Sequence, residues 1–173
     1  MLRRCFLALA SLLLTTMPAH AQANEAAPVE WGSVLIYQAE ILDTVLPDEA
    51  QLSGYIDRLQ AAAEAQAQNS SLRGAGVLFV ALAPDGRARV WLLPTSGAVL
   101  PNVSEQWEDA LSAVQGMPVQ HYFVFGLAFG TRGMAAYQAF GVPPIPADWE
   151  AQIPPGGVTL DDAFIARAWP AGR

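Results

Sequence analysis

The chain has 173 residues, and its 16 acidic residues outnumber nine basic ones to give a formal net charge of −7. Hydrophobic residues make up 53% of the chain and charged residues 14%, which excludes a disordered acidic tail, because such tails are poor in hydrophobic residues. The acidic balance also argues against a nucleic-acid-binding protein, since phosphate contacts need a basic surface.

Residues 1–21 have the organisation of a cleaved export signal. Arg3 and Arg4 form its charged start, an apolar run extends from Cys5 to Leu14, and Ala19-His20-Ala21 is a small-x-small cleavage site. The apolar run is shorter than the roughly 20 residues needed to span a bilayer. Arg3-Arg4-Cys5-Phe6-Leu7 also resembles the core of a twin-arginine export signal, but the strongly apolar run favours the Sec route.

Cleavage after residue 21 of 173 would leave 152 residues, and loss of Arg3 and Arg4 would change the net charge from −7 to −9. The remaining chain would contain no cysteine and a single histidine, His121. Because no disulfide could then form, its stability would come from the core, and about 150 residues suffice for one. We therefore expect a periplasmic or secreted protein with no membrane span after cleavage.

The next two segments precede the main helix. Residues 22–30 are rich in alanine, glutamine and glutamate and are expected to form a flexible start. Residues 31–46 are ambiguous, because apolar side chains recur at helical spacing while residues 34–37 form a short β-prone run. We favour a helix here. Its inward positions would be Trp31, Val34, Leu35, Gln38, Ile41, Leu42 and Val45.

A firmer helix is predicted for residues 47–68. Pro47 suits a first turn, and the carboxylates of Asp48 and Glu49 favour the positive end of the helix dipole. The polar run Asn69-Ser70-Ser71 ends it. The predicted inward face consists of Leu52, Tyr55, Ile56, Leu59 and Ala63.

A hairpin follows. Residues 76–83 are apolar on both faces, which is typical of a central or covered strand. Pro84-Asp85-Gly86-Arg87 forms a turn, since proline fixes φ and glycine supplies positive φ. Residues 88–93 return as the partner strand, with Arg87 and Arg89 expected on its solvent side.

A second helix and a last strand complete the predicted sheet unit. Asn102-Val103-Ser104-Glu105 is typical of a helix cap and predicts a helix over 103–115. Apolar residues then alternate without a break over 119–129, which predicts a strand. Its one apolar face comprises Val119, His121, Phe123, Phe125, Leu127 and Phe129.

The C-terminal segment contains less regular structure. Residues 134–140 could form one short helix. Five prolines make 142–157 a loop around Trp149 that is expected to sustain neither a helix nor a central strand. Residues 159–162 are expected to cap a final short helix anchored by Phe164 and Trp169. Residues 31–173 are thus predicted to form a single α+β domain, with a small antiparallel sheet of three to four strands packed against helices.

The sequence offers few groups for catalysis. His121 shares strand parity with phenylalanine and leucine side chains, so we interpret it as a sheet-end or core histidine. No Gly-x-Ser-x-Gly elbow is present, and a zinc site is improbable without more Cys or His ligands. The acidic pairs Glu108-Asp109 and Asp161-Asp162 are typical of solvated helix faces and helix starts. We expect no enzymatic activity, no metal and no cofactor.

Aromatic residues provide the candidate contact surface, which consists of Trp91, Arg89 and Trp149. Trp91 lies on the Arg89 face of its strand, and that face could be a contact surface or be covered by helices. Trp149 could pack the proline-rich loop onto the domain or be an exposed recognition residue. The sequence alone leaves both pairs of alternatives open.

Residues 76–129 resemble the C-terminal domain of the TonB family. The hairpin of that domain is often Asp-Gly-Arg, here Asp85-Gly86-Arg87; a Ser-Gly pair commonly follows its second strand, here Ser96-Gly97; and its last strand opens near Pro-Val, here Pro118-Val119. The resemblance implies that an exposed strand edge binds an extended peptide of a partner by strand pairing. The energy transducers of that family have a membrane anchor and a long proline-rich spacer before the domain. We expect this chain to be cleaved and to have neither, so the resemblance implies an interaction module and not a transducer.

The leading hypothesis is an exported soluble periplasmic protein that acts as a non-catalytic binding module for another envelope or exported protein. One alternative is a carrier of a small apolar ligand, with Phe123, Phe125, Leu127 and Phe129 lining its cavity. The other is an inhibitor or immunity protein against an exported toxin, which fits the small, acidic, exported profile.

Overall fold

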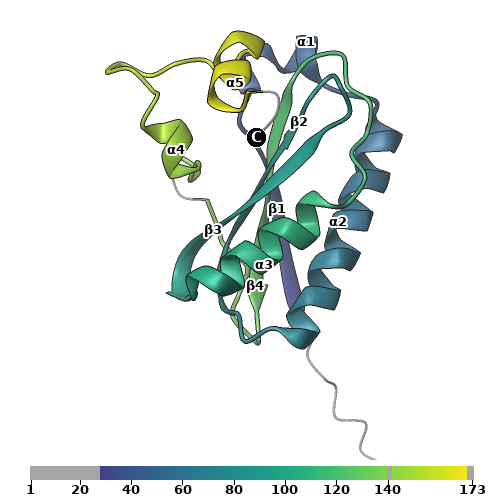
Figure 1. Ribbon diagram of the computed structural model, residues 1–173, viewed down its shortest axis with the longest axis vertical. Coiled ribbons are helices and arrows are strands. Elements are labelled where there is room, and N and C mark those ends of the chain that lie inside the picture. The colour runs from purple at the N-terminus through teal and green to yellow at the C-terminus, as the bar shows by residue number, and fades with distance from the viewer. Residues whose placement is uncertain (1–27, 140–141, 171–173) are drawn as a thin grey trace, which may run out of the picture.

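Four antiparallel strands form one sheet in the order β1-β4-β2-β3. The computed structural model describes residues 28–139 and 142–170 (Figure 1), so the predicted signal at 1–21 and most of the start at 22–30 lie outside the described residues. The strands are β1 (Val29–Ile36), β2 (Arg73–Leu82), β3 (Ala88–Ala98) and β4 (Phe123–Thr131). The structure confirms the predicted α+β class, a single domain with helices packed on a small antiparallel sheet.

The helix favoured for residues 31–46 is wrong over its first half. Residues 29–36 are β1, which pairs antiparallel with β4. The helical spacing of the apolar residues describes only a 3₁₀ turn, η1 (Ala39–Ile41), and a short helix, α1 (Leu42–Val45). The β-prone run at 34–37 was the better guide, because pairing with a buried neighbouring strand outweighs a weak helical periodicity.

The first long helix, α2 (Glu49–Asn69), agrees with the prediction for 47–68. The side chain of Asp48 accepts a hydrogen bond of 2.9 Å from the Gln51 amide and caps the helix. Four side chains facing the sheet are buried, whereas the predicted Leu52 and Ile56 are only partly so. The buried four are Tyr55, Leu59, Ala63 and Ala67.

The second long helix, α3 (Pro101–Ser112), begins and ends earlier than predicted. Pro101 occupies the first helical turn, where its missing N–H costs no hydrogen bond, and no side chain caps the helix. The predicted cap at Asn102-Val103-Ser104-Glu105 is therefore wrong, because those residues are already helical. Its buried side chains are those of Val103, Trp107 and Leu111.

The hairpin of β2 and β3 is longer than predicted. The turn at 84–87 lies between them as expected, and every residue of β2 after Arg73 is buried, as a central strand requires. Strand β3 continues past Pro94 to Ala98, with a register shift between Ala75 and Gly76 of β2. A bulge lets the pairing continue around a proline that cannot donate to the ladder.

Strand β4 begins at Phe123, four residues later than predicted, and continues to Thr131. Before it, the Tyr122 amide donates to Asp162 Oδ1 at 2.9 Å. Near its start, the Val124 amide donates to Gln38 Oε1 at 2.8 Å. Side chains from other segments thus satisfy the backbone donors where an additional length of strand pairing was expected.

Two cores form on the two faces of the sheet. One lies under α2 and α3 and contains the predicted apolar face of β4, from Phe123 to Phe129. The other contains Trp149 of α4 (Ala147–Glu150) together with Phe164 and Trp169 from α5 (Asp162–Ala168) and its C-terminal end. The prediction of a capped final helix anchored by Phe164 and Trp169 is confirmed, since these side chains are 1% and 3% exposed.

Two predictions for the C-terminal segment are wrong. The proline-rich loop at 142–157 does contain one helical turn, α4, which follows Pro146 and places Trp149 in the core. The described residues 134–139, by contrast, form no helix. This segment packs against β4, where a side chain on Gly130 would collide with Met134 and Ala135, and the Tyr137 amide donates to the Phe129 carbonyl at 3.2 Å.

Candidate functional site

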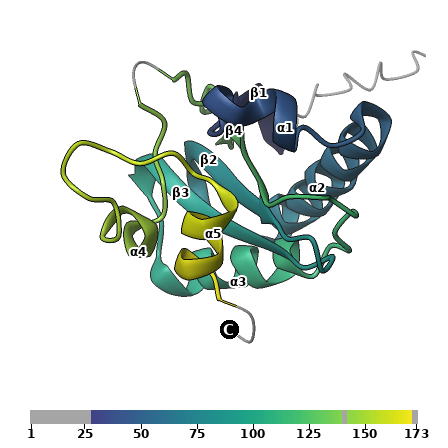
Figure 2. The ribbon, with the colours of Figure 1, turned by 90° about the horizontal axis from the view of Figure 1, so that it is seen from above.

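The β3 edge of the sheet is covered by α3. Viewed from above, β1, β4, β2 and β3 follow one another and α3 lies beyond β3 (Figure 2). The Val90 amide donates to Ser112 Oγ at 2.9 Å, and the Leu92 amide donates to Glu108 Oε1 at 3.0 Å. Both donors point away from β2, so α3 side chains satisfy the groups that an added strand would use.

The β1 edge is more open. In the described part of the chain, the main-chain groups of 29–36 have no hydrogen-bonding partner outside the pairing with β4. Glu30, Gly32, Ser33 and Val34 are exposed, and Val34, at 46%, is a large apolar side chain on this strand. An exposed strand edge carries unpaired N–H and C=O groups that can template pairing with another chain.

The shape around β1 adds a groove of about 550 Å³ between β1 and residues 135–139. Residues 135–139 lie close to β1 because Gly32 has no side chain. A Cβ at position 32 would lie 3.0 Å from the Cβ atoms of Ala128 and Ala136. The Trp31 indole donates to Glu64 of α2 at 3.0 Å, which fixes one end of the strand to the main helix. The position of the open β1 edge is therefore fixed by this contact with α2.

The predicted contact residues lie in the second core. Trp149 is fully buried and Trp91 is 6% exposed, and their rings are 5.4 Å apart in a T-shaped arrangement. The guanidinium carbon of Arg89 lies 4.6 Å from the centroid of the Trp91 ring. Trp149 thus packs the proline-rich loop onto the domain, and the two indoles do not form an exposed patch.

The two arginines predicted on the solvent side of β3 are only partly exposed. Arg87 stacks on Trp169 with its guanidinium carbon 4.6 Å from the ring centroid, and its Nε lies 2.7 Å from Asp85 Oδ2. The hydrogen bonds from Arg87 hold the pKa of the exposed Asp85 carboxyl below its usual range. The hairpin end therefore carries its cations on the faces of tryptophans.

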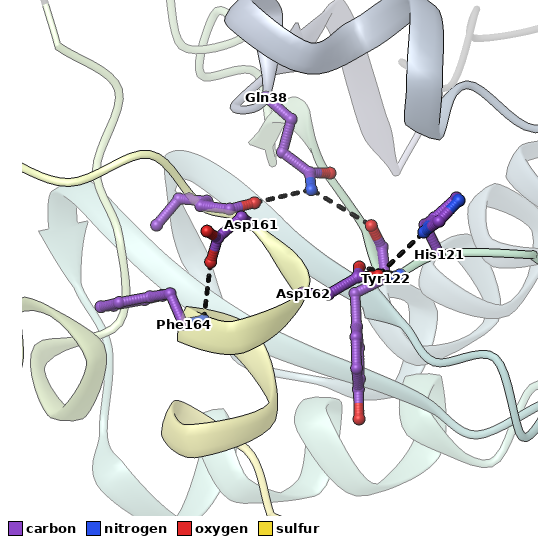
Figure 3. Close-up of polar contacts among 7 residues, drawn as sticks. Gln38, His121, Tyr122, Asp161, Asp162 and Phe164 are labelled. Atoms are coloured by element: carbon purple, nitrogen blue, oxygen red, sulfur yellow. Dashed lines mark hydrogen bonds and ion pairs between the residues drawn. The ribbon is translucent and has the colours of Figure 1, made fainter.

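His121 lies two residues before β4, at the end of the sheet, and is partly exposed. Its Nδ1 is 2.8 Å from Asp162 Oδ2, and the other carboxylate oxygen accepts from the Tyr122 amide (Figure 3). A carboxylate–histidine pair can orient a catalytic base, but a nucleophile must then lie within reach. The pair joins the start of α5 to the chain just before β4, and among the described residues no Ser or Thr side chain is hydrogen-bonded to His121.

Gln38, which sequence reasoning did not single out for a polar role, forms the centre of the same region (Figure 3). It is 1% exposed, and its Nε2 donates to the Tyr122 carbonyl at 3.1 Å and to the Leu160 carbonyl at 2.7 Å. With the Val124 amide on its Oε1, one side chain connects the chain after β1 to β4 and to the C-terminal segment. A glutamine at an apolar helical position was the only available signal.

Of the four side chains considered for an apolar cavity, the three phenylalanines pack against aromatic residues of the helices or against one another, and Leu127 is buried in the same core. Phe125 packs edge-on against Tyr55 with ring centroids 6.4 Å apart, and Phe129 stacks on Trp107 at 6.3 Å. Phe123 stacks on Phe125 at 5.7 Å. Burial raises the pKa of the Tyr55 hydroxyl well above its usual value, although the Arg58 guanidinium lowers it in part.

Within 28–139 and 142–170, no three His, Cys, Asp or Glu side chains converge to hold a metal ion. None of the helices there combines the length and the apolar composition that crossing a membrane requires.

Comparison with known proteins gives no relative. The chain matches no protein-family model, no curated protein and no solved structure.

Proposed function

We propose that this protein is a non-catalytic binding module that takes an extended segment of a partner protein along the β1 edge. The observation that carries the proposal is the difference between the two edges. The amides of Val90 and Leu92 on β3 are satisfied by α3 side chains, whereas the edge of 29–36 has no such cover among the described residues. An added strand forms main-chain hydrogen bonds along such an edge and places alternate side chains in the neighbouring surface.

The groove beside β1 supports the same proposal. Its walls are residues of β1 and residues 135–139. Exposed Val34 and the partly exposed Trp31 and Leu35 offer apolar contact area at this edge. Main-chain pairing would then give affinity, and the groove would give side-chain selectivity.

The cellular setting is also a proposal. The export signal predicted at residues 1–21 would direct the module to the periplasm or outside the cell, so its partner would be another envelope or exported protein. The proposal also draws on the resemblance of 76–129 to the C-terminal domain of the TonB family, whose members bind extended peptides by strand pairing.

Site-specific photo-crosslinking in the producing cells tests this function. A benzoylphenylalanine in place of Val34 should give an adduct with one dominant protein. The same residue in place of Val158, an apolar side chain that is 40% exposed on the C-terminal segment, is the matched control and should give none. Equal adducts at both positions, or none at position 34, would contradict the proposal. The identity of the adduct separates an envelope partner from an exported toxin.

A further inference from the structure

A second groove lies at the opposite edge of the sheet from β1. It has a volume of about 750 Å³, and its walls are the turn and start of β3, the C-terminal end of α3, and the chain around Asp148 and Trp169. Pockets of about 300–1,000 Å³ are the usual size for small-molecule sites. No residue of β1 lines this groove, so binding here would be independent of the function proposed for the β1 edge.

Two arginines line this groove from the hairpin. Arg87 lies over the ring of Trp169 and Arg89 over the ring of Trp91, each at 4.6 Å, and the two rings are 6.2 Å apart. Stacking on an aromatic face fixes the plane of a guanidinium and leaves its edge available for hydrogen bonds. Trp169 and Trp91 therefore fix both guanidinium groups at one end of the sheet.

The two arginines differ in their partners. Arg87 is paired with Asp85, although its Nη1 is buried without a hydrogen-bonding partner among the described residues. Arg89 has neither a hydrogen bond nor an ion pair there. A guanidinium that is fixed in place and is not neutralised by the protein is suited to bind a carboxylate through two parallel hydrogen bonds.

Two carboxylates line the same groove, Asp109 from α3 and Asp148 from α4. Neither forms an ion pair with Arg87 or Arg89 in the described part of the chain. The groove thus contains positively and negatively charged side chains that form no ion pair with each other among the described residues. A ligand that carries only a carboxylate would meet Arg89 but also the two acidic groups, whereas a zwitterion satisfies both.

We propose that this groove binds a short zwitterionic ligand of the peptide class, with its carboxylate on Arg89 and its ammonium group toward Asp109 and Asp148. The guanidinium groups of the two arginines lie over the tryptophan faces, and the groove volume of about 750 Å³ lies within the usual range for small-molecule sites. Arg89 is the principal ligand of the carboxylate, because Arg87 already pairs with Asp85.

Titration of the ¹⁵N-labelled protein with triglycine tests the proposal, with N-acetyltriglycine as the probe that lacks the ammonium group. Triglycine should shift the amide signals of residues 86–89 and the indole signals of Trp91 and Trp169. N-acetyltriglycine should bind more weakly. Absence of triglycine shifts at these positions, or equal affinity for the two probes, would overturn the proposal.

Matched variants identify the charges. Arg89→Gln should weaken triglycine binding by about tenfold or more, since it removes charge-assisted hydrogen bonds. Arg58→Gln is the control and should leave binding unchanged, because Arg58 lies over Tyr55 on α2. Asp148→Asn should weaken binding of triglycine but not of N-acetyltriglycine. If Arg89→Gln does not fold, the Asp148→Asn contrast still decides, and equal losses for both probes would count against the proposal.

Discussion

The two edges of the sheet are treated differently by the fold. At the β3 edge, Ser112 and Glu108 accept the outward amides of Val90 and Leu92, and α3 lies along the strand. At the β1 edge, four of eight residues are exposed and a groove runs alongside. Proteins usually protect exposed edges because they promote unwanted pairing. We propose that the edge that the fold leaves open is the one that a partner uses.

Removal of the β3 cover should have the largest effect. The double variant Ser112→Ala and Glu108→Ala leaves two amides on a buried strand without partners, and each loss should lower the free energy of unfolding by about 1 kcal/mol or more. The uncovered edge should also promote self-association. Chemical denaturation and sedimentation velocity measure the two effects.

Glu105→Ala is the matched control for that variant, because Glu105 is an exposed acidic residue on the same helix. It should change neither stability nor association state beyond a few tenths of a kcal/mol. A double variant as stable and as monodisperse as this control would mean that α3 does not protect the edge.

Release of β1 from α2 should have the next largest effect. Trp31→Phe removes the 3.0 Å hydrogen bond to Glu64 while keeping an aromatic ring, and should cost about 1 kcal/mol of stability. A double-mutant cycle with Glu64→Ala isolates this term by thermal or chemical unfolding. A coupling energy near zero would show that the bond does not anchor the strand.

The C-terminal end of β1 gives a pH-dependent test. The Tyr37 hydroxyl donates to the Pro144 carbonyl at 2.6 Å, and burial raises its pKa well above the ordinary value. Because the folded pKa is raised, the contribution of Tyr37 is complete below its unfolded pKa of about 10 and is lost as pH rises from there toward the folded pKa. Stability should therefore fall above pH about 10.

Phenylalanine variants separate Tyr37 from Tyr55, whose pKa burial also raises. Tyr37→Phe should lose about 1 kcal/mol at neutral pH, since it breaks the bond to Pro144. Tyr55→Phe should be neutral or slightly stabilising, because the Tyr55 hydroxyl is buried without a partner among the described residues. Chemical denaturation at neutral and alkaline pH checks both values. If a variant that combines Tyr37→Phe with Tyr55→Phe still lost stability steeply at alkaline pH, the loss could not be assigned to these two hydroxyls.

Val34→Lys should have the smallest effect on stability and a large effect on binding. The side chain is 46% exposed, so the free energy of unfolding should change by less than about 0.5 kcal/mol. A lysine on an edge strand disfavours strand addition, so affinity for the crosslinked partner should fall by about tenfold. Val158→Lys is the control for calorimetric binding measurements, and equal affinity of the two variants would argue against β1.

The sequence predicted the elements whose patterns are local and strong. The continuous apolar run of β2, the turn at 84–87, the acidic residues at the start of α2 and the anchors Phe164 and Trp169 all have short-range signals. Strand β1 was missed because its pairing with β4 is about 90 residues distant along the chain and its apolar residues also fit a helix.

The candidate site could not be predicted for the same reason. Which edge is open depends on where α3 packs, and no local pattern connects Ser112 and Glu108 to the amides of β3. The tryptophans selected as contact residues are part of the core. Trp149 reaches Trp91 because the proline-rich segment folds back onto the sheet, and the positions of the prolines in the sequence do not specify that path. Which edge is open is a property of the assembled sheet.

Native-state hydrogen–deuterium exchange, resolved by residue, tests the difference between the edges most directly. We expect the amides of Val90 and Leu92 to be strongly protected, although they point away from β2. In β1, the amides that face away from β4 should exchange nearly as fast as those of the 84–87 turn. Rapid exchange at Val90 and Leu92, or protection of every amide in 29–36, would contradict the conclusion that β1 is the open edge.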